Sequence, residues 1–168
     1  QGEFCNPFFP QWGYDKGNES ALNSFLHFAR YMNPEYRHIP WSVIAEGYDA
    51  FGLFDRGDAA MLAYGAGRYA LQMGDTRTAE ALWPLIEWTL EYCRRKLNEH
   101  GVVASEADEL EKRFPAGDAN LCTSSLYYDA LRSAAWLAEQ TGRPQRLADE
   151  YRRRAETLRE NIERFFGA

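Results

Sequence analysis

Hydrophobic residues recur at spacings of three and four along much of this chain, the spacing that places side chains on one face of an α-helix. Residues 18–32, 58–73, 76–97 and 119–142 follow this pattern. It is clearest in residues 145–166, where the apolar positions are Leu147, Tyr151, Ala155, Leu158, Ile162 and Phe165. The opposite face of that segment carries a run of charged residues, which we expect to face solvent: Arg152, Arg153, Arg154, Glu156, Arg159 and Glu160. The pattern predicts an all-α fold.

Residues that favour helix ends divide the pattern into separate helices. Asn18, Asp58 and Asp118 precede apolar-periodic segments and are predicted N-caps, because a short polar side chain can accept a hydrogen bond from a free backbone N–H of the first turn. Gly74 is a predicted C-cap. Pro84 lies beyond the first turn of its segment, so we expect a kink or a restart of the helix there.

A short motif repeats and predicts tandem antiparallel helical hairpins. Gly57-Asp58-Ala59 recurs as Gly117-Asp118-Ala119, and each motif opens a more apolar helix, a tight turn and a more polar helix. Recurrence at this period is typical of stacked helical hairpins. We therefore expect the more apolar helices to face a shared centre and the long loops to emerge at one end.

The chain is predicted to be a single all-α domain of 168 residues, a length that can bury a substantial core. Residues 1–57 would form an irregular lead, one helix and a long loop. Residues 58–97 would form the first hairpin, residues 98–117 an acidic loop, and residues 118–166 the second hairpin. The three small residues Gly65, Ala66 and Gly67 would allow close approach of a neighbouring helix.

Charge and composition exclude several classes of partner. A net charge of −6 argues against nucleic acid, and no apolar run reaches the roughly 20 residues of a membrane span. No signal peptide is visible at the start, although a mature secreted chain would look the same, so the compartment stays open. Cys5, Cys93 and Cys122 are far apart and odd in number, so we expect small buried residues rather than a metal site or disulfide framework, and no cofactor.

The segment from Ser105 to Asn120 is the first candidate for chemistry. It places four carboxylates within six positions and follows them with a basic pair: Glu106, Asp108, Glu109, Glu111, Lys112 and Arg113. Glycoside hydrolysis needs two carboxyl groups, one protonated and one ionised, and like charges at short range keep one of them protonated. The alternative is a set of surface carboxylates in an acidic protein.

Residues 34–57 are the second candidate, because a connection of this length is uncommon in a compact domain unless it serves a function. The segment carries residues suited to contact a sugar: Trp41, Glu46, Tyr48, Asp49, Asp55 and Arg56. Aromatic residues make up 15% of the chain, and Tyr and Trp combine an apolar ring with a polar group, which suits a sugar-binding cleft. A core rich in large rings is the competing interpretation.

Three stretches resemble the six-hairpin (α/α toroid) glycosidases, in particular the amylo-α-1,6-glucosidase domain of glycogen debranching enzymes and processing α-glucosidase I. They are DAAMLAYGAGRYALQMGD, LWPLIEWTLEYC and SEADELEKRFPAGDANLCTSSLYYDALRSAAWLAEQTG, within residues 57–166. The resemblance implies a part of an (α/α)6 toroid that acts on a carbohydrate. It implies that Asp108 is the general acid, that Arg113 contacts sugar hydroxyls, and that Asp58 and Arg56 lie at the mouth of the preceding inner helix. Debranching members have Trp before the acid, whereas Glu106-Ala107 stands there here, so the acid is either Glu106 or Asp108.

The resemblance also implies that this chain is a fragment of a larger enzyme. A ring of six hairpins needs more helices than the pattern predicts, and in this clan the catalytic base comes from a later hairpin. The isolated chain is then expected to be inactive and to self-associate through exposed helix faces.

Two other functions are compatible with such a fold. An epimerase or a polysaccharide lyase would need a His or Tyr base, for which the candidates are His38, His100, Tyr127 and Tyr128. A helical-repeat interaction module would have no catalytic residues at all.

Overall fold

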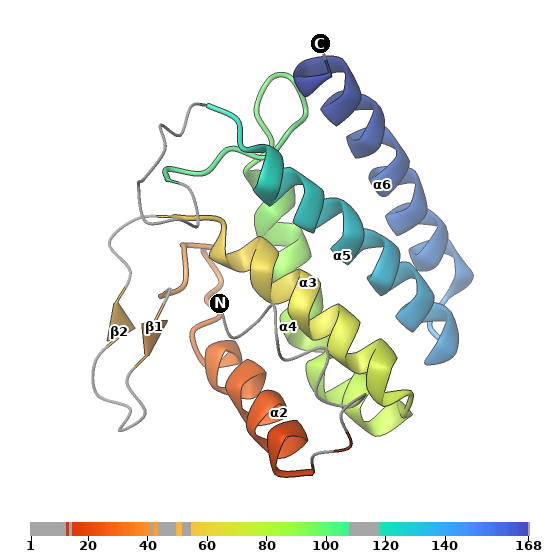
Figure 1. Ribbon diagram of the computed structural model, residues 1–168. Coiled ribbons are helices and arrows are strands. Elements are labelled where there is room, and N and C mark those ends of the chain that lie inside the picture. Colours follow the sequence, from red (N-terminus) through yellow and green to blue (C-terminus); the bar gives the residue numbers. More distant parts are fainter. Residues whose placement is uncertain are drawn as a thin grey trace.

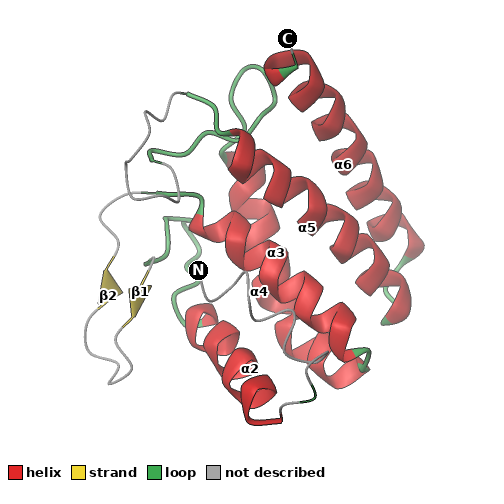
Figure 2. Cartoon of the chain, viewed as in Figure 1, coloured by secondary structure: helices red, strands yellow, loops and turns green. Residues whose placement is uncertain are grey.

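The fold is all-α, as predicted, in a computed structural model that describes residues 13, 15–40, 42–43, 50–51, 55–107 and 118–167 (Figures 1 and 2). The elements in chain order are α2 (Asp15–Ala29), β1 (Ser42–Val43), β2 (Ala50–Phe51), α3 (Asp58–Met73), α4 (Thr76–Arg95), α5 (Leu121–Gln140) and α6 (Gln145–Phe166). The two short strands pair antiparallel, with Ser42 opposite Phe51 and Val43 opposite Ala50.

Helices α3 to α6 form two antiparallel hairpins that lie side by side. In Figure 1, α3 and α5 run in the same direction, α4 returns behind α3, and α6 returns beside α5. α5 packs against both α3 and α6, and α2 packs against α4. The first residues of α3 and of α5 therefore lie at one end of the stack, together with the described part of the loop after α4 (Figure 1). We call this end the rim and the opposite end, where each hairpin reverses, the turn end.

Several predicted helix boundaries are wrong. α2 begins at Asp15, so Asn18 is inside the helix and not its N-cap, and the Asn18 carbonyl accepts a hydrogen bond from the Tyr69 hydroxyl at 2.8 Å. α5 is capped by Asn120, whose side chain accepts from the Thr123 N–H at 3.0 Å, and not by Asp118. At α5, a residue of similar capping chemistry thus stands two positions after the predicted cap, and α2 begins three positions before its predicted cap.

Asp58 and Pro84 also differ from expectation. Gly57 is the N-cap of α3, with φ 86°, and Asp58 is the first helical residue and makes no capping hydrogen bond. α4 runs without a restart through Pro84, which is exposed, while its neighbours Trp83 and Leu85 are buried. Burial of the residues on either side holds the helix together across a proline that lacks an N–H donor.

The core lies between the four hairpin helices and extends to α2. Its largest fully buried side chains include Tyr69, Tyr127, Phe25, Leu82 and Leu85. α3 and α5 approach each other closely at Gly67, where a Cβ atom would lie 3.1 Å from the Cβ of Ser133. The prediction that the small residues of α3 permit close helix packing is thus supported at Gly67.

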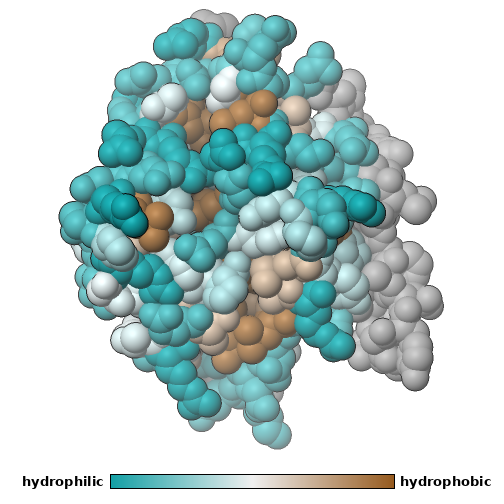
Figure 3. Space-filling model, turned by 180° about the vertical axis from the view of Figure 1, so that it is seen from behind, coloured by the Kyte–Doolittle hydropathy of each residue, from teal (hydrophilic) through white to brown (hydrophobic). Residues whose placement is uncertain are grey.

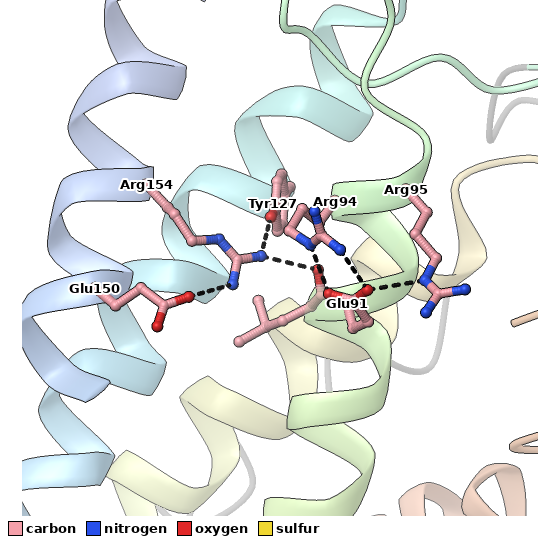
Figure 4. Close-up of polar contacts among 7 residues, drawn as sticks. Glu91, Arg94, Arg95, Tyr127, Glu150 and Arg154 are labelled. Carbon is pink, nitrogen blue, oxygen red and sulfur yellow. Dashed lines mark hydrogen bonds and ion pairs between the residues drawn. The ribbon is translucent and has the colours of Figure 1, made fainter. Parts of the chain in front are cut away.

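A polar cluster ties α4, α5 and α6 together beneath the rim (Figure 4). The Arg154 guanidinium donates to the Tyr127 hydroxyl at 2.5 Å and to the Leu90 carbonyl at 3.3 Å, and it lies 3.6 Å from Glu150. Burial is the main reason why the pKa of Tyr127 is raised to about 12. The prediction that Arg154 lies on a purely solvated face is therefore wrong, because this side chain reaches back across α6 to two other helices.

The neighbouring carboxylate of Glu91 accepts hydrogen bonds from Arg94 at 2.6 and 2.7 Å and from Arg95 at 2.8 Å. The Arg94 hydrogen bond is the largest cause of its low pKa, about 2. These basic residues stand in the last turn of α4, where they also complement the negative end of the helix dipole.

The surface seen from behind is largely hydrophilic, with hydrophobic residues in separate patches (Figure 3). Trp136, Leu121 and Phe165 are the most exposed large apolar residues of the described chain, at 55%, 48% and 43%. Among the described helices, we find none that combines the length and the apolar character required to span a bilayer.

Candidate functional site

The segment that enters α3 and the segment that begins the acidic loop lie against each other at the rim. The Ala107 N–H donates to the Asp55 carbonyl at 3.0 Å, although 52 positions, 107 minus 55, separate the two residues. The Ala104 N–H donates to the Lys96 carbonyl at 2.9 Å and so attaches the same segment to the end of α4. The structure therefore brings the two segments that the sequence singles out to one end of the hairpin stack.

Asp55 joins these segments through its side chain as well. Its carboxylate is 4% exposed and accepts from the Gly57 N–H at 2.8 Å and from the Tyr92 hydroxyl at 2.5 Å. Lys96 Nζ lies 4.0 Å from the same carboxylate. Burial, and then the negative charge of Asp55, raises the pKa of Tyr92 above its ordinary value, so the hydroxyl remains a hydrogen-bond donor.

Asp58 is a second buried carboxyl group, one turn from Asp55. Its Oδ1 lies 3.3 Å from Arg56 Nη2, and the residue is 7% exposed. Burial raises the pKa of Asp58 to about 6, because desolvation outweighs the opposing charge of Arg56 and because Asp55 adds a further negative charge. A carboxyl group with this pKa exchanges its proton near neutral pH, which suits acid–base chemistry.

Glu106 is placed at the same rim. It precedes Ala107, whose N–H is bound to Asp55, and its own charge contributes to the raised pKa of Tyr92. Glu106 is exposed, whereas Ser105 and Ala107 on either side are buried, and the Ser105 hydroxyl donates to the Ala107 carbonyl at 3.0 Å. The backbone around Glu106 is thus held while its carboxylate faces outward.

The remaining predicted site residues lie outside the described residues. They are Asp108 and Arg113 of the acidic loop and Trp41, Glu46 and Tyr48 of the long connection. Of the predicted site, the structure therefore places Glu106, Asp58 and Arg56, and it brings the three together at the rim.

The side chains considered as bases for an epimerase or lyase do not gather there. Tyr127 is engaged by Arg154, and His100 stacks on Phe165 with ring centroids 4.7 Å apart. Tyr128 lies beside Arg132, whose guanidinium carbon is 5.7 Å from the ring centroid. His38 is exposed.

The described residues contain no group of three or more His, Cys, Asp or Glu side chains arranged to hold a metal ion. Cys93 is buried, and burial raises the pKa of its thiol. Cys122 is exposed, so the prediction of a buried residue is wrong there, and Cys5 lies outside the described residues. Cys122 stands in the first turn of α5, on the side that faces away from the core.

Tyr92 is the site residue that sequence reasoning misses, and Asp55 enters it only as one of several polar residues of the long connection. The one available signal is the cluster Asp55-Arg56-Gly57-Asp58, in which two carboxylates flank an arginine at a helix start.

Comparison of the sequence with models of known protein families and with curated proteins finds no match.

Proposed function

We propose that this chain is part of a glycoside hydrolase that acts on an α-linked oligo- or polysaccharide. The observation that carries the proposal is the pair of rim carboxyl groups in different states: Asp58, buried with a pKa of about 6, and Glu106, exposed at the start of the acidic loop. Two carboxyl groups in different environments are what hydrolysis of a glycosidic bond requires.

In this proposal Asp108 or Glu106 is the general acid. It transfers its proton to the glycosidic oxygen as the bond from that oxygen to the anomeric carbon breaks. Water attacks the anomeric carbon and loses its proton to a base, which a further hairpin of the larger enzyme supplies. Trp41, Glu46, Tyr48, Arg56, Asp58 and Arg113 are proposed to contact the sugar. The proposed enzyme is a six-hairpin toroid of which this chain forms a part.

The rim itself supports this assignment of roles. Asp55 and Tyr92 hold the residue before Asp108 through the hydrogen bond between the Ala107 N–H and the Asp55 carbonyl. A general acid must be positioned within hydrogen-bond reach of the oxygen it protonates, so a fixed backbone beside it is an advantage.

The test is hydrolysis of maltotriose and panose by the protein that carries this chain, measured as released reducing sugar. Asp108→Asn and Glu106→Gln remove the candidate acids one at a time, and we expect one of them to reduce turnover by about 10²- to 10⁴-fold while saccharide binding persists. Glu99→Gln is the matched control, since this side chain is 86% exposed in the turn after α4. Near-normal turnover in both acid variants would remove these residues from the role.

The same assay separates the alternatives. A lyase would release unsaturated product that absorbs in the ultraviolet without net hydrolysis, and an epimerase would change the sugar without releasing reducing ends. A non-catalytic helical-repeat module would show neither activity nor saccharide binding.

A further inference from the structure

The two hairpins repeat in register, which allows their surfaces to be compared position by position. Gly74 and Gly142 end the first helix of each hairpin in the left-handed conformation, with φ 67° and 69°, and they are 68 positions apart in the sequence. The same offset of 68 aligns the small residues 65–67 of α3 with residues 133–135 of α5. With this offset, buried positions of α3 such as Ala66 and Ala70 fall on buried Ala134 and Ala138. α4 begins at residue 76 and α6 at residue 145, so the offset between the second helices is 69. With this offset, four buried residues of α4 align with four buried residues of α6: Ala79, Leu82, Ile86 and Thr89 with Ala148, Tyr151, Ala155 and Leu158.

In the first hairpin, the groove beside α3 and α4 is filled by the second hairpin. Gly67 of α3 faces Ser133 of α5. On α4, Trp83 contacts the Tyr151 ring at 6.4 Å between centroids, and the Leu90 carbonyl accepts from Arg154 at 3.3 Å. The side of the first hairpin that receives another helix pair thus combines small and apolar residues with charged ones, such as Arg68, which donates to Asp129 of α5 at 2.7 Å.

The corresponding groove of the second hairpin, between α5 and α6, is open and has a volume of about 400 Å³. Its lining differs from that of the first at the equivalent positions. Ala60 of α3 corresponds to Tyr128 of α5, and Trp83 and Leu90 of α4 correspond to Arg152 and Arg159 of α6. A large ring and two charged groups replace small and apolar residues at these three positions, whereas Arg132 and Trp136 correspond to Tyr64 and Arg68 of α3. The groove therefore offers aromatic and charged side chains to a polar ligand.

Two side chains on the α5 wall of the groove are available to a ligand. Trp136 is 55% exposed and also lines an adjoining groove between α3 and α5. Arg132 lies over the Tyr128 ring at 5.7 Å and donates to the Tyr128 hydroxyl at 3.4 Å, and within the described part of the chain no carboxylate is within ion-pair distance of it. By contrast, Arg152 is bound to Glu139 at 2.6 Å and Arg159 to Glu163 at 2.6 Å.

We propose that the α5–α6 groove binds an acidic saccharide unit, with the sugar ring on the Trp136 indole and the sugar carboxylate on the Arg132 guanidinium. A guanidinium binds a carboxylate through two parallel hydrogen bonds, and an exposed indole offers a flat apolar surface with a polar edge. Three arginines and one glutamate line the groove, a local excess of positive charge in a chain whose net charge is −6. The ligand is therefore an anionic sugar such as a uronic acid. The site is separate from the rim, and it requires that the further hairpins of the proposed enzyme leave this groove open.

The test is binding of α-1,4-linked trigalacturonate to the full chain, followed by calorimetry and tryptophan fluorescence, with maltotriose as the neutral counterpart. We expect trigalacturonate to bind more tightly than maltotriose, and Trp136→Ala and Arg132→Gln each to weaken it by about tenfold or more, as loss of one charge-assisted contact would. Far-ultraviolet circular dichroism and thermal unfolding confirm that each variant is folded.

Phe165→Ala and Arg153→Gln are matched controls, because one removes another exposed ring and the other an exposed arginine outside the groove. If Asp58→Asn weakens trigalacturonate binding and the groove variants do not, the rim and not the groove binds this ligand, and the proposal is overturned. The proposal is overturned if the wild-type chain does not bind trigalacturonate, if the groove variants weaken maltotriose binding as much as trigalacturonate binding, or if the controls weaken binding as much as the groove variants do. It is also overturned if Trp136→Ala changes only the oligomeric state.

Discussion

Two aspartates follow left-handed glycines at opposite ends of the hairpin stack and behave in opposite ways. At the turn end, Asp75 caps α4: its carboxylate accepts from the Thr78 N–H and the Thr78 hydroxyl, both at 2.8 Å. The Thr78 backbone hydrogen bond is the largest cause of its lowered pKa. At the rim, Asp58 follows Gly57, makes no capping hydrogen bond, is buried, and has a pKa raised to about 6. The same dipeptide thus stabilises a helix in one place and presents a protonatable group in the other, because burial and available donors differ.

The largest expected effect is on the pH dependence of stability through Asp58. Its pKa of about 6 in the folded state is higher than the ordinary aspartate value of 3.8, so the folded chain binds this proton more strongly. The stabilisation is complete below about pH 4 and is lost as the pH rises through about 6, at most about 3 kcal/mol of unfolding free energy. Urea denaturation between these pH values should show the decline in the wild-type chain and a flatter profile in Asp58→Asn.

Asp75→Asn is the comparison variant for that experiment, since it keeps the shape of an aspartate at the other end of the stack. It should retain the decline between about pH 4 and 6. If Asp58→Asn also retains the decline in stability, the pKa of the Asp58 carboxyl group is not raised by burial.

A smaller effect is expected from Tyr92→Phe. This change leaves one oxygen of the buried Asp55 carboxylate without its hydroxyl donor, which should reduce the free energy of unfolding by about 1–3 kcal/mol. Tyr36→Phe is the control, because the Tyr36 ring stacks on Trp88 at 5.4 Å and its hydroxyl makes no hydrogen bond to the described residues. Equal losses in the two variants would show that the Tyr92–Asp55 contact has no special role in the rim.

The smallest effect is expected from Asp75→Ala, which removes the cap of α4. Loss of an aspartate N-cap costs about 1 kcal/mol. Because the folded pKa of Asp75 is lowered, its contribution is present above its ordinary pKa and is lost as the pH falls through the folded value. Urea denaturation should therefore separate Asp75→Ala from the wild type at pH 7, and the difference should shrink as the pH falls below the ordinary range of an aspartate. A difference that grows on acidification would contradict the capping role.

The turn end and the rim also differ in how much of their structure can be predicted from the sequence. Gly74 and the periodic stripe of α6 predict the hairpins because both signals are local. The predicted cap Asp118 is wrong because Asn120, two positions later, offers similar chemistry, and the predicted cap Asn18 is wrong because α2 begins at Asp15. At the rim, local acidity is enough to single out Glu106 and Asp58.

The contact between Tyr92 and Asp55 joins residues 37 positions apart. Arg154 donates to Tyr127 from a helix face that the sequence pattern predicts to be charged and exposed to solvent. Such contacts depend on how the helices pack. Neither the periodicity nor the composition of the sequence contains information on helix packing, so these two contacts cannot be predicted from it.

The most direct test of the rim as a saccharide site is a ¹³C carboxyl NMR titration of the wild-type chain with and without panose, resolved for Asp58, Glu106 and Asp75. Our account predicts that Asp58 titrates at about 6, that Asp75 titrates below its ordinary range, and that panose shifts the Asp58 and Glu106 resonances while the Asp75 resonance stays in place. An Asp58 resonance that titrates in the ordinary range of an aspartate and does not respond to panose would contradict it.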